Sequence, residues 1–269
     1  MRISAQNRHF FALYGRAELY NLTLCSCSSH SEYTTKRVFD LILAVTAVII
    51  LSPVFLFAAI GIKLASKGPV FYRAVRAGKD GMPFTIVKFR TMHILKDGGS
   101  RITAGKDPRI FGWGSFLRKT KIDELPQLMN ILKGEMSFVG PRPEDMDIVR
   151  ERYTPLFMKT LDLKPGLSSP GSVYYYTHLE DGIDSEDPER YYVEKLLPFK
   201  LAFELVYIDR QSLVYDLRIM FRTALTVLRI ALGKKEFKLP PEYDAAMQYL
   251  ERMRSETADM PEETKGVTL

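Results

Sequence analysis

The longest uninterrupted hydrophobic segment of the chain covers residues 41–62, which are uncharged and mostly Leu, Ile, Val, Ala and Phe. Roughly 22 residues are enough to cross a bilayer as one helix. The segment has no polar face, which disfavours a buried helix of a soluble core. Ser52-Pro53 lies almost at its midpoint, and an interior proline costs about 3 kcal/mol in a straight helix. The pattern therefore predicts a membrane helix that bends at Ser52-Pro53.

Cations flank this segment on both sides, with Lys36 and Arg37 before it and Lys63 and Lys67 after it. A spanning helix is expected to show an asymmetric charge distribution, whereas a helix that bends and returns keeps both basic ends on the cytoplasmic face. We therefore favour a re-entrant membrane helix over residues 35–67, with a single span as the alternative. The serine hydroxyl at the bend would then bond a carbonyl that the proline leaves free.

After Gly68 the pattern becomes that of a globular domain. Residues 70–75 and 84–90 read as two strands joined across a Gly-Lys-Asp-Gly turn. Lys88 and Arg90 are two positions apart and so project from the same face of the second strand. They either bind phosphate or protect a solvated edge strand by their charge. Residues 96–107 read as a loop that is either a mobile lid or a linker.

The C-terminal part is predicted to contain two helices, over residues 190–209 and 213–232. In the second, Arg218, Arg222 and Arg229 fall within about 40° of one another on a helical wheel. A basic stripe beside leucines is typical of a helix in the membrane interface, and an ordinary surface helix is the alternative. The expected fold is α+β and mostly helical. It divides into a poorly defined extension (1–34), the membrane helix (35–67), a globular domain (68–209), the amphipathic helix (210–233) and a charged tail with a short helix (234–269).

Composition narrows the class of partner. The chain has 269 residues, 46% of them hydrophobic, a formal net charge of +6 and a pI of about 9.1. The positive charge favours an anionic partner such as membrane lipid or a nucleotide. Cys25 and Cys27 are too few for a disulfide framework, and His30 alone does not complete a zinc site with them.

The candidate chemistry lies in residues 116–143, which read FLRKTKIDELPQLMNILKGEMSFVGPRP. Asp123 and Glu124 stand side by side among cations, ahead of an apolar helical run. Pro126 fits only the first turn of that helix, which places both carboxylates at or before its N-terminus. Anions, including phosphate, are favoured there, so a carboxylate should stay ionised. The alternative is that Asp123 merely caps the helix.

A membrane helix beside a basic domain with paired carboxylates suggests chemistry on a phosphorylated substrate at the membrane surface. Phosphoryl transfer between a lipid phosphate and a nucleotide needs cations, Mg²⁺ on pyrophosphate oxygens, and an oxygen nucleophile. Asp123 could supply that oxygen through an aspartyl-phosphate type of intermediate.

These residues resemble the bacterial sugar transferases, also called small monotopic phosphoglycosyl transferases. The resemblance covers roughly residues 36–235, and its central motif is long and specific. The matching motifs are KRVFD (36–40), Ser52-Pro53, GPVFYR (68–73), KFRTM (88–92), DPRI (107–110), the 116–143 stretch and KPGL (164–167).

The resemblance implies transfer of a phospho-sugar from a nucleotide-diphosphate sugar, usually a UDP-sugar, to polyprenyl (undecaprenyl) phosphate, with release of UMP. Asp123 would be the nucleophile and a Mg²⁺ ligand, and Glu124 its acidic partner. The expected setting is the bacterial inner membrane with the catalytic domain on the cytoplasmic face, in exopolysaccharide or glycoconjugate synthesis. No nucleic-acid partner is expected, and a homodimer is compatible with the resemblance. Lys88, Arg118 and Arg142 resemble the family's phosphate-contacting cations, Arg90 is added to them from its place beside Lys88, and Pro141 and Pro143 would fix the Arg142 loop.

The chain departs from the family pattern after residue 167. The family often continues there with a Gly-Trp tract leading to Asn-Gly-Arg, whereas this chain has three consecutive tyrosines at 174–176. No nucleotide or sugar contact is therefore carried over beyond that point. Two other functions stay open, a non-catalytic scaffold of a glycan-assembly complex and a membrane-anchored phosphohydrolase that uses water as acceptor.

Overall fold

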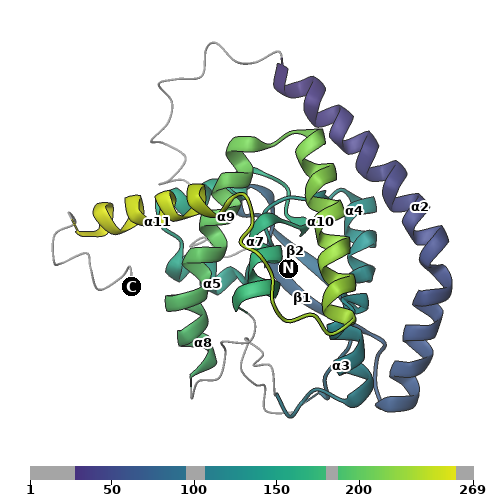
Figure 1. Ribbon diagram of the computed structural model, residues 1–269. Coiled ribbons are helices and arrows are strands. Elements are labelled where there is room, and N and C mark those ends of the chain that lie inside the picture. The colour runs from purple at the N-terminus through teal and green to yellow at the C-terminus, as the bar shows by residue number, and fades with distance from the viewer. Residues whose placement is uncertain (1–27, 95–106, 180–186, 259–269) are drawn as a thin grey trace, which may run out of the picture. The chain divides into compact units, whose positions relative to one another are not determined.

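The computed structural model describes residues 28–94, 107–179 and 187–258. All of the predicted 96–107 loop except its last residue, and most of the predicted N-terminal extension, therefore lie outside the described residues. The chain divides into two units, residues 1–39 and 40–269. The described part of the first unit is the beginning of helix α2, and the other labelled elements belong to the second unit (Figure 1).

Helix α2 (Ser28–Ala65) runs without interruption through Pro53. It begins before residue 35, so part of the predicted extension is helical. The hydroxyl of Ser52 donates to the carbonyl of Ile49 at 2.8 Å, and this is the carbonyl whose helical partner would be the missing N–H of Pro53. The predicted compensation is confirmed, whereas the re-entrant path stays a prediction. Within the described ranges, α2 is the one helix long and apolar enough to cross a membrane, which indicates membrane association.

The two sides of α2 have different surroundings. Ala44, Ala58 and Ile62 are fully buried against the globular part of the second unit. Ile50 and Leu56 are more than 60% exposed. Because only one face of an apolar helix is covered by protein, its remaining surface is free to meet lipid.

Strands β1 (Phe71–Ala77) and β2 (Pro83–Phe89) form the predicted antiparallel hairpin, with Tyr72 opposite Lys88. The connecting turn contains a short 3₁₀ segment, Lys79–Gly81, in which Asp80 has a φ of 55°. Arg90 lies just beyond the end of β2. The hairpin confirms the strand prediction with bounds shifted by one or two residues.

Helix α3 (Gly112–Lys119) is followed by a 3₁₀ helix, η2 (Ile122–Gln127), and by α4 (Leu128–Lys133). Sequence predicted one helix with Pro126 in its first turn, but the proline lies inside η2. Asn130 joins α4 to β2, since its side chain accepts from the Val87 N–H at 3.1 Å and donates to the Thr85 carbonyl at 2.7 Å. The carboxylate pair is thereby held against the hairpin.

The chain then forms a second, two-stranded parallel sheet from β3 (Ser137–Val139) and β4 (Gly166–Ser168). Short helical pieces surround it. These are α5 (Met146–Arg152), α6 (Pro155–Met158), η3 (Lys159–Asp162), α7 (Pro170–Tyr174), the π-helical η4 (Tyr175–Leu179), α8 (Pro188–Tyr191) and the π-helical η6 (Tyr192–Leu196).

Three longer helices complete the unit, α9 (Leu197–Arg210), α10 (Leu213–Ala231) and α11 (Tyr243–Ala258). The predicted helix at 190–209 is confirmed, because α8, η6 and α9 follow one another without a break, and its middle part, η6, has π-helical geometry. The amphipathic helix is confirmed as α10. The predicted charged tail contributes α11, which packs on α9 through Ala246 and Leu250 against Ala202 and Phe203 (Figure 1).

Candidate active site

The site is built around Asp123 and Glu124 in the first turn of η2. Lys121, just before η2, has a φ of 55°, and this left-handed residue turns the chain from α3 into the 3₁₀ helix. Neither carboxylate caps a helix: η2 has no side-chain cap bond, and α4 continues directly from it. The capping interpretation of Asp123 is therefore wrong.

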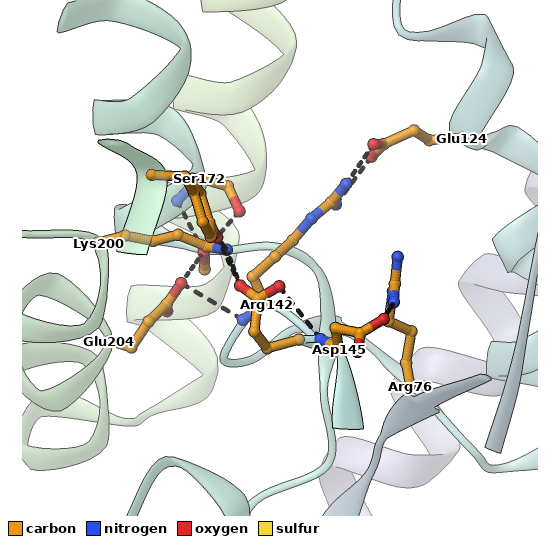
Figure 2. Close-up of polar contacts among 10 residues, drawn as sticks. Arg76, Glu124, Arg142, Asp145, Ser172, Lys200 and Glu204 are labelled. Carbon is orange, nitrogen blue, oxygen red and sulfur yellow. Dashed lines mark hydrogen bonds and ion pairs between the residues drawn. The ribbon is translucent and has the colours of Figure 1, made fainter. Parts of the chain in front are cut away.

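Glu124 is clamped by two cations. Both oxygens of its carboxylate accept from the guanidinium of Arg142, at 2.8 Å for the longer bond (Figure 2). One of them also accepts from Lys88 Nζ at 3.0 Å. Burial alone would raise the pKa of Glu124, but Arg142 and then Lys88 hold it well below its usual range. Burial lowers the pKa of Lys88, and Glu124 opposes that shift. Glu124 is thus ionised at neutral pH and fixes the position of two cations.

Asp123 has a contrasting environment although it is the next residue. Its side chain is 9% exposed, and its Oδ1 has no hydrogen-bond partner among the described residues. Burial, followed by the charge of Glu124, raises its pKa to about 6, while Lys88 leads the cations that oppose the shift. A helix N-terminus was expected to keep this carboxylate ionised. Burial has the larger effect and favours its protonated form. An ionised Asp123 with an unpartnered oxygen has the character of a nucleophile or of a metal ligand.

The segment that carries Arg142 is held by backbone contacts to β4. The Pro141 carbonyl accepts from Gly166 N–H at 2.9 Å, and Gly140 N–H donates to the Ser168 carbonyl at 3.1 Å. A Cβ at Gly140 would lie 2.3 Å from the Lys164 carbonyl oxygen, so this approach requires glycine. Arg142 is therefore presented from a rigid support.

The other predicted cations are placed differently. Arg118 in α3 lies near enough to lower the pKa of Asp123. Arg90 does not join the cluster, because its guanidinium donates to the Ser66 hydroxyl and carbonyl and to the Pro69 carbonyl, at 2.6 to 2.9 Å. Those bonds tie the end of α2 to β2, so the structure gives Arg90 a structural role.

A family model for "Bacterial sugar transferase" matches residues 31–230, which is most of the chain. The chain belongs to the bacterial sugar transferase family. The match includes α2, the carboxylate pair, the Arg142 segment and α10, so all parts of the described cluster lie within it.

Three relatives show what this sugar transferase is similar to. It is 39% identical over 197 residues, 72% of this chain and 38% of the relative, to a UDP-glucose:undecaprenyl-phosphate glucose-1-phosphate transferase of Xanthomonas campestris pv. campestris. A protein of the same name from Caulobacter vibrioides is 37% identical over 72% of this chain and 69% of its own length. The exopolysaccharide production protein PSS of Rhizobium leguminosarum bv. phaseoli is 34% identical over 75% of this chain and 99% of its own length. The chain thus matches only part of the Xanthomonas relative and nearly all of the Rhizobium one.

Sequence reasoning missed two groups of this sugar transferase that line the cluster. Lys121 Nζ lies 3.6 Å from the centroid of the Tyr176 ring. Burial lowers the pKa of Arg142, and Tyr176 is, after Glu124, among the groups that raise it. The run of three tyrosines at 174–176 was the available signal in the sequence. Two of them lie in the π-helical η4, and π-helical segments are frequent at functional sites. Glu204 of α9 also reaches the Arg142 segment, and a single acidic residue in an apolar helix gave no comparable signal.

The fit of Mg²⁺ to the site rests on Asp123. The described residues contain no group of three or more His, Cys, Asp or Glu side chains that would enclose a metal ion. The unpartnered, buried Oδ1 of Asp123 nevertheless suits a cation held chiefly by substrate oxygens and water, as Mg²⁺ commonly is. The described residues thus offer one carboxylate oxygen, Asp123 Oδ1, to a divalent cation.

Proposed function

We propose that this sugar transferase moves a phospho-sugar from a nucleotide-diphosphate sugar, a UDP-sugar in the first instance, to polyprenyl (undecaprenyl) phosphate. The products are polyprenyl-diphosphate sugar and UMP. The observation that carries the proposal is the pairing of an unpartnered buried Asp123 oxygen with a neighbouring anion, Glu124, that holds Lys88 and Arg142 in place. A scaffold has no need of buried charges in this arrangement, because they cost stability.

The reaction would proceed in two steps. A carboxylate oxygen of Asp123 attacks the sugar-bearing phosphorus, the bond from that phosphorus to the bridging oxygen breaks, and UMP leaves with the electron pair. A phosphate oxygen of the polyprenyl phosphate then attacks the same phosphorus, and the bond to Asp123 breaks, which restores the carboxylate. Each step exchanges one P–O bond for another.

The surrounding side chains have separate tasks in this scheme. Lys88 and Arg142 stabilise the charge that develops on the transferred phosphoryl oxygens, and Arg118 adds positive potential near Asp123. Glu124, whose pKa is held low chiefly by Arg142 once burial is overcome, acts as the holder of those cations. Mg²⁺ held by Asp123 would supply Lewis-acid neutralisation of pyrophosphate charge.

The proposed location is the cytoplasmic face of the bacterial inner membrane. The exposed side of α2, together with the cationic ends of its apolar run, supports a monotopic attachment that places a lipid phosphate beside a soluble nucleotide. The exposed Leu213, Leu217 and Phe221 of α10 support a second contact with the interface. Arg222 lies on the predicted basic stripe, but Glu242 pairs with it at 2.8 Å and offsets its charge.

The test uses the full-length protein in nanodiscs with Mg²⁺, polyprenyl phosphate and a panel of UDP-sugars, with UMP release as the readout. We expect multiple turnovers only with lipid, and about one equivalent of UMP per protein without it. Labelled UMP should exchange into the UDP-sugar in the absence of lipid, as a covalent intermediate requires.

Asp123→Asn should abolish both release and exchange, whereas the surface change Asp147→Asn should leave both intact. Full activity of Asp123→Asn would refute the nucleophile assignment. Sustained release without lipid would identify a phosphohydrolase, and no release with any donor would favour a scaffold.

A further inference from the structure

Helix α9 carries two ionisable side chains in a buried environment. Lys200 is 7% exposed and Glu204 is fully buried. The two residues are four positions apart and so lie on one face of the helix. Buried polar groups need partners. Lys200 and one oxygen of Glu204, Oε1, find theirs around the segment that carries Arg142, whereas Glu204 Oε2 has none among the described residues.

Glu204 contacts the backbone of Arg142 itself. Its Oε1 accepts from the Arg142 N–H at 3.3 Å and from the Ser169 hydroxyl at 2.6 Å (Figure 2). A Cβ at Gly171 would lie 2.6 Å from this same Oε1, so α7 approaches α9 closely only because residue 171 is glycine. Proximity of this kind excludes water and fixes the position of the carboxyl.

Lys200 holds the chain on the other side of Arg142. Its Nζ donates to Glu144 Oε2 at 2.8 Å and to the Tyr192 hydroxyl at 2.8 Å. Glu144 is two residues after Arg142, and its carbonyl accepts from Ala77 N–H at the end of β1. The segment is thus fixed at residue 142 by Glu204 and at residue 144 by Lys200.

The stability of the fold does not by itself require a polar side chain at position 204. An apolar side chain of similar volume would fill the position of Glu204 at no electrostatic cost, and replacing buried charges by hydrophobic residues is often neutral or stabilising. The polar side chain at this place joins two parts of the chain, because one oxygen accepts from Ser169 at the start of α7 and from the backbone of Arg142. The guanidinium at the other end of that residue holds Glu124, beside Asp123.

We infer that Glu204 is a positioning residue that sets the location of Arg142 for the reaction, with Lys200 as its counterpart at Glu144. The inference deepens the proposed function and rests on it for its kinetic readout. Burial raises the pKa of Glu204 to about 7, so a neutral amide is a close mimic of its protonated form. Glu204→Gln retains an oxygen acceptor, whereas Glu204→Ala and Glu204→Leu remove it.

The experiment compares these variants with Val206→Ala, a truncation on the same helix whose side chain packs in the cluster shared with α11. Lipid-dependent UMP release gives kcat and KM for the UDP-sugar. Hydrogen exchange of a peptide covering residues 140–145 reports on the Arg142 amide without any need for activity, and thermal unfolding measures stability.

We expect Glu204→Ala to lower kcat at least about tenfold with a smaller change in KM, because a displaced phosphate-binding group can cost up to about a hundredfold. Exchange at residues 140–145 should accelerate in the same variant. Glu204→Gln should restore both quantities to within about threefold of wild type. Val206→Ala should lower the unfolding temperature but leave kcat and the exchange of this peptide unchanged.

Several outcomes would overturn the inference. One is wild-type kcat and exchange in Glu204→Ala. Another is an equal loss in Glu204→Gln and in Glu204→Ala, and a third is the same loss in Val206→Ala, which would show a structural effect only. Should the alanine variant not fold, Glu204→Leu replaces it, since its volume is similar. A wild-type protein without lipid-dependent release would refute the proposed function, and the exchange data would still decide the role of Glu204.

Discussion

Helices α2 and α9 are both rich in hydrophobic residues, yet they are covered in opposite ways. Apart from its buried face, α2 leaves large side chains such as Ile50 and Leu56 in contact with solvent. Helix α9 is buried on most sides, and its polar Lys200 and Glu204 are buried as well. Helix α2 is the more hydrophobic of the two and is nevertheless the one that protein covers less. The difference teaches that the destination of an apolar helix depends on what the rest of the fold brings to it.

The sharpest test of this comparison uses the same substitution in each helix. Leu201→Ala in α9 should lower the free energy of unfolding by about 2–5 kcal/mol, because the side chain is 2% exposed and its removal leaves a cavity. Leu56→Ala in α2, 64% exposed, should change it by no more than about 0.5 kcal/mol. Denaturant unfolding in detergent measures both. Similar losses in the two variants would mean that the exposed side of α2 is covered by protein.

A charge placed on the exposed side of α2 tests its lipid contact. Ile50→Lys should cost about 2.5–3.5 kcal/mol of membrane insertion if the residue lies deep in the bilayer, and should leave the detergent-solubilised protein folded. Membrane fractionation and circular dichroism provide the two measurements.

Tags at both ends of the chain should be accessible only from the cytoplasm if α2 is re-entrant, and periplasmic exposure of the first tag would show a true span.

The carboxylate pair makes a prediction with opposite signs for its two members. Asp123 has a folded pKa of about 6 against 3.8 for an ordinary Asp, so the folded state binds this proton more tightly. Its ionisation therefore costs stability as pH rises from about 4 to 6. Asp123→Asn should gain about 1–3 kcal/mol at pH 7.5, and the gain should vanish near pH 3.5.

Glu124 has a lowered folded pKa, since Arg142 and Lys88 outweigh burial. Its contribution to stability is present above the ordinary pKa of a glutamate and is lost as pH falls. Glu124→Gln should therefore be destabilised at pH 7.5. Thermal unfolding across this pH range checks both variants. A destabilised Asp123→Asn at neutral pH would contradict the assignment of its raised pKa to burial.

The smallest expected effect concerns the proline in α2. Ser52→Ala removes the hydroxyl that satisfies the Ile49 carbonyl, and should cost about 1 kcal/mol. Thr46→Ala is the matched control, because Thr46 also bonds a carbonyl of α2, that of Ile42, but with no proline four residues after that carbonyl. An equal cost in both variants would show that the proline site has no special need of its hydroxyl.

Much of the fold could be predicted from the sequence because its signals are local. The hairpin, α10 and the bond from Ser52 each depend on a few neighbouring residues. The site was predicted as far as its motif extends, and Lys88, Glu124 and Arg142 do meet. The sequence pattern could not show that Arg90 donates its hydrogen bonds to Ser66 and Pro69, since only the tertiary fold brings these groups together.

The role of Glu204 was also beyond sequence reasoning. Its partners Ser169 and Arg142 lie 35 and 62 residues away in the chain, and no periodicity connects them. The length of α11 was missed for a related reason. Its alanines and tyrosines form a convincing apolar face only once α9 is in place to receive it.

Helix α11 has a practical consequence for how this protein is handled. The family match ends at residue 230, whereas α11 spans Tyr243–Ala258. A protein shortened at residue 230 would lose the contacts of Phe203 in α9 with α11, and Arg222 would lose its ion pair with Glu242. Such a truncate is expected to aggregate, and its failure would be misread as a defect of the catalytic region. The boundary of what relatives share is not the boundary of what this chain needs to fold.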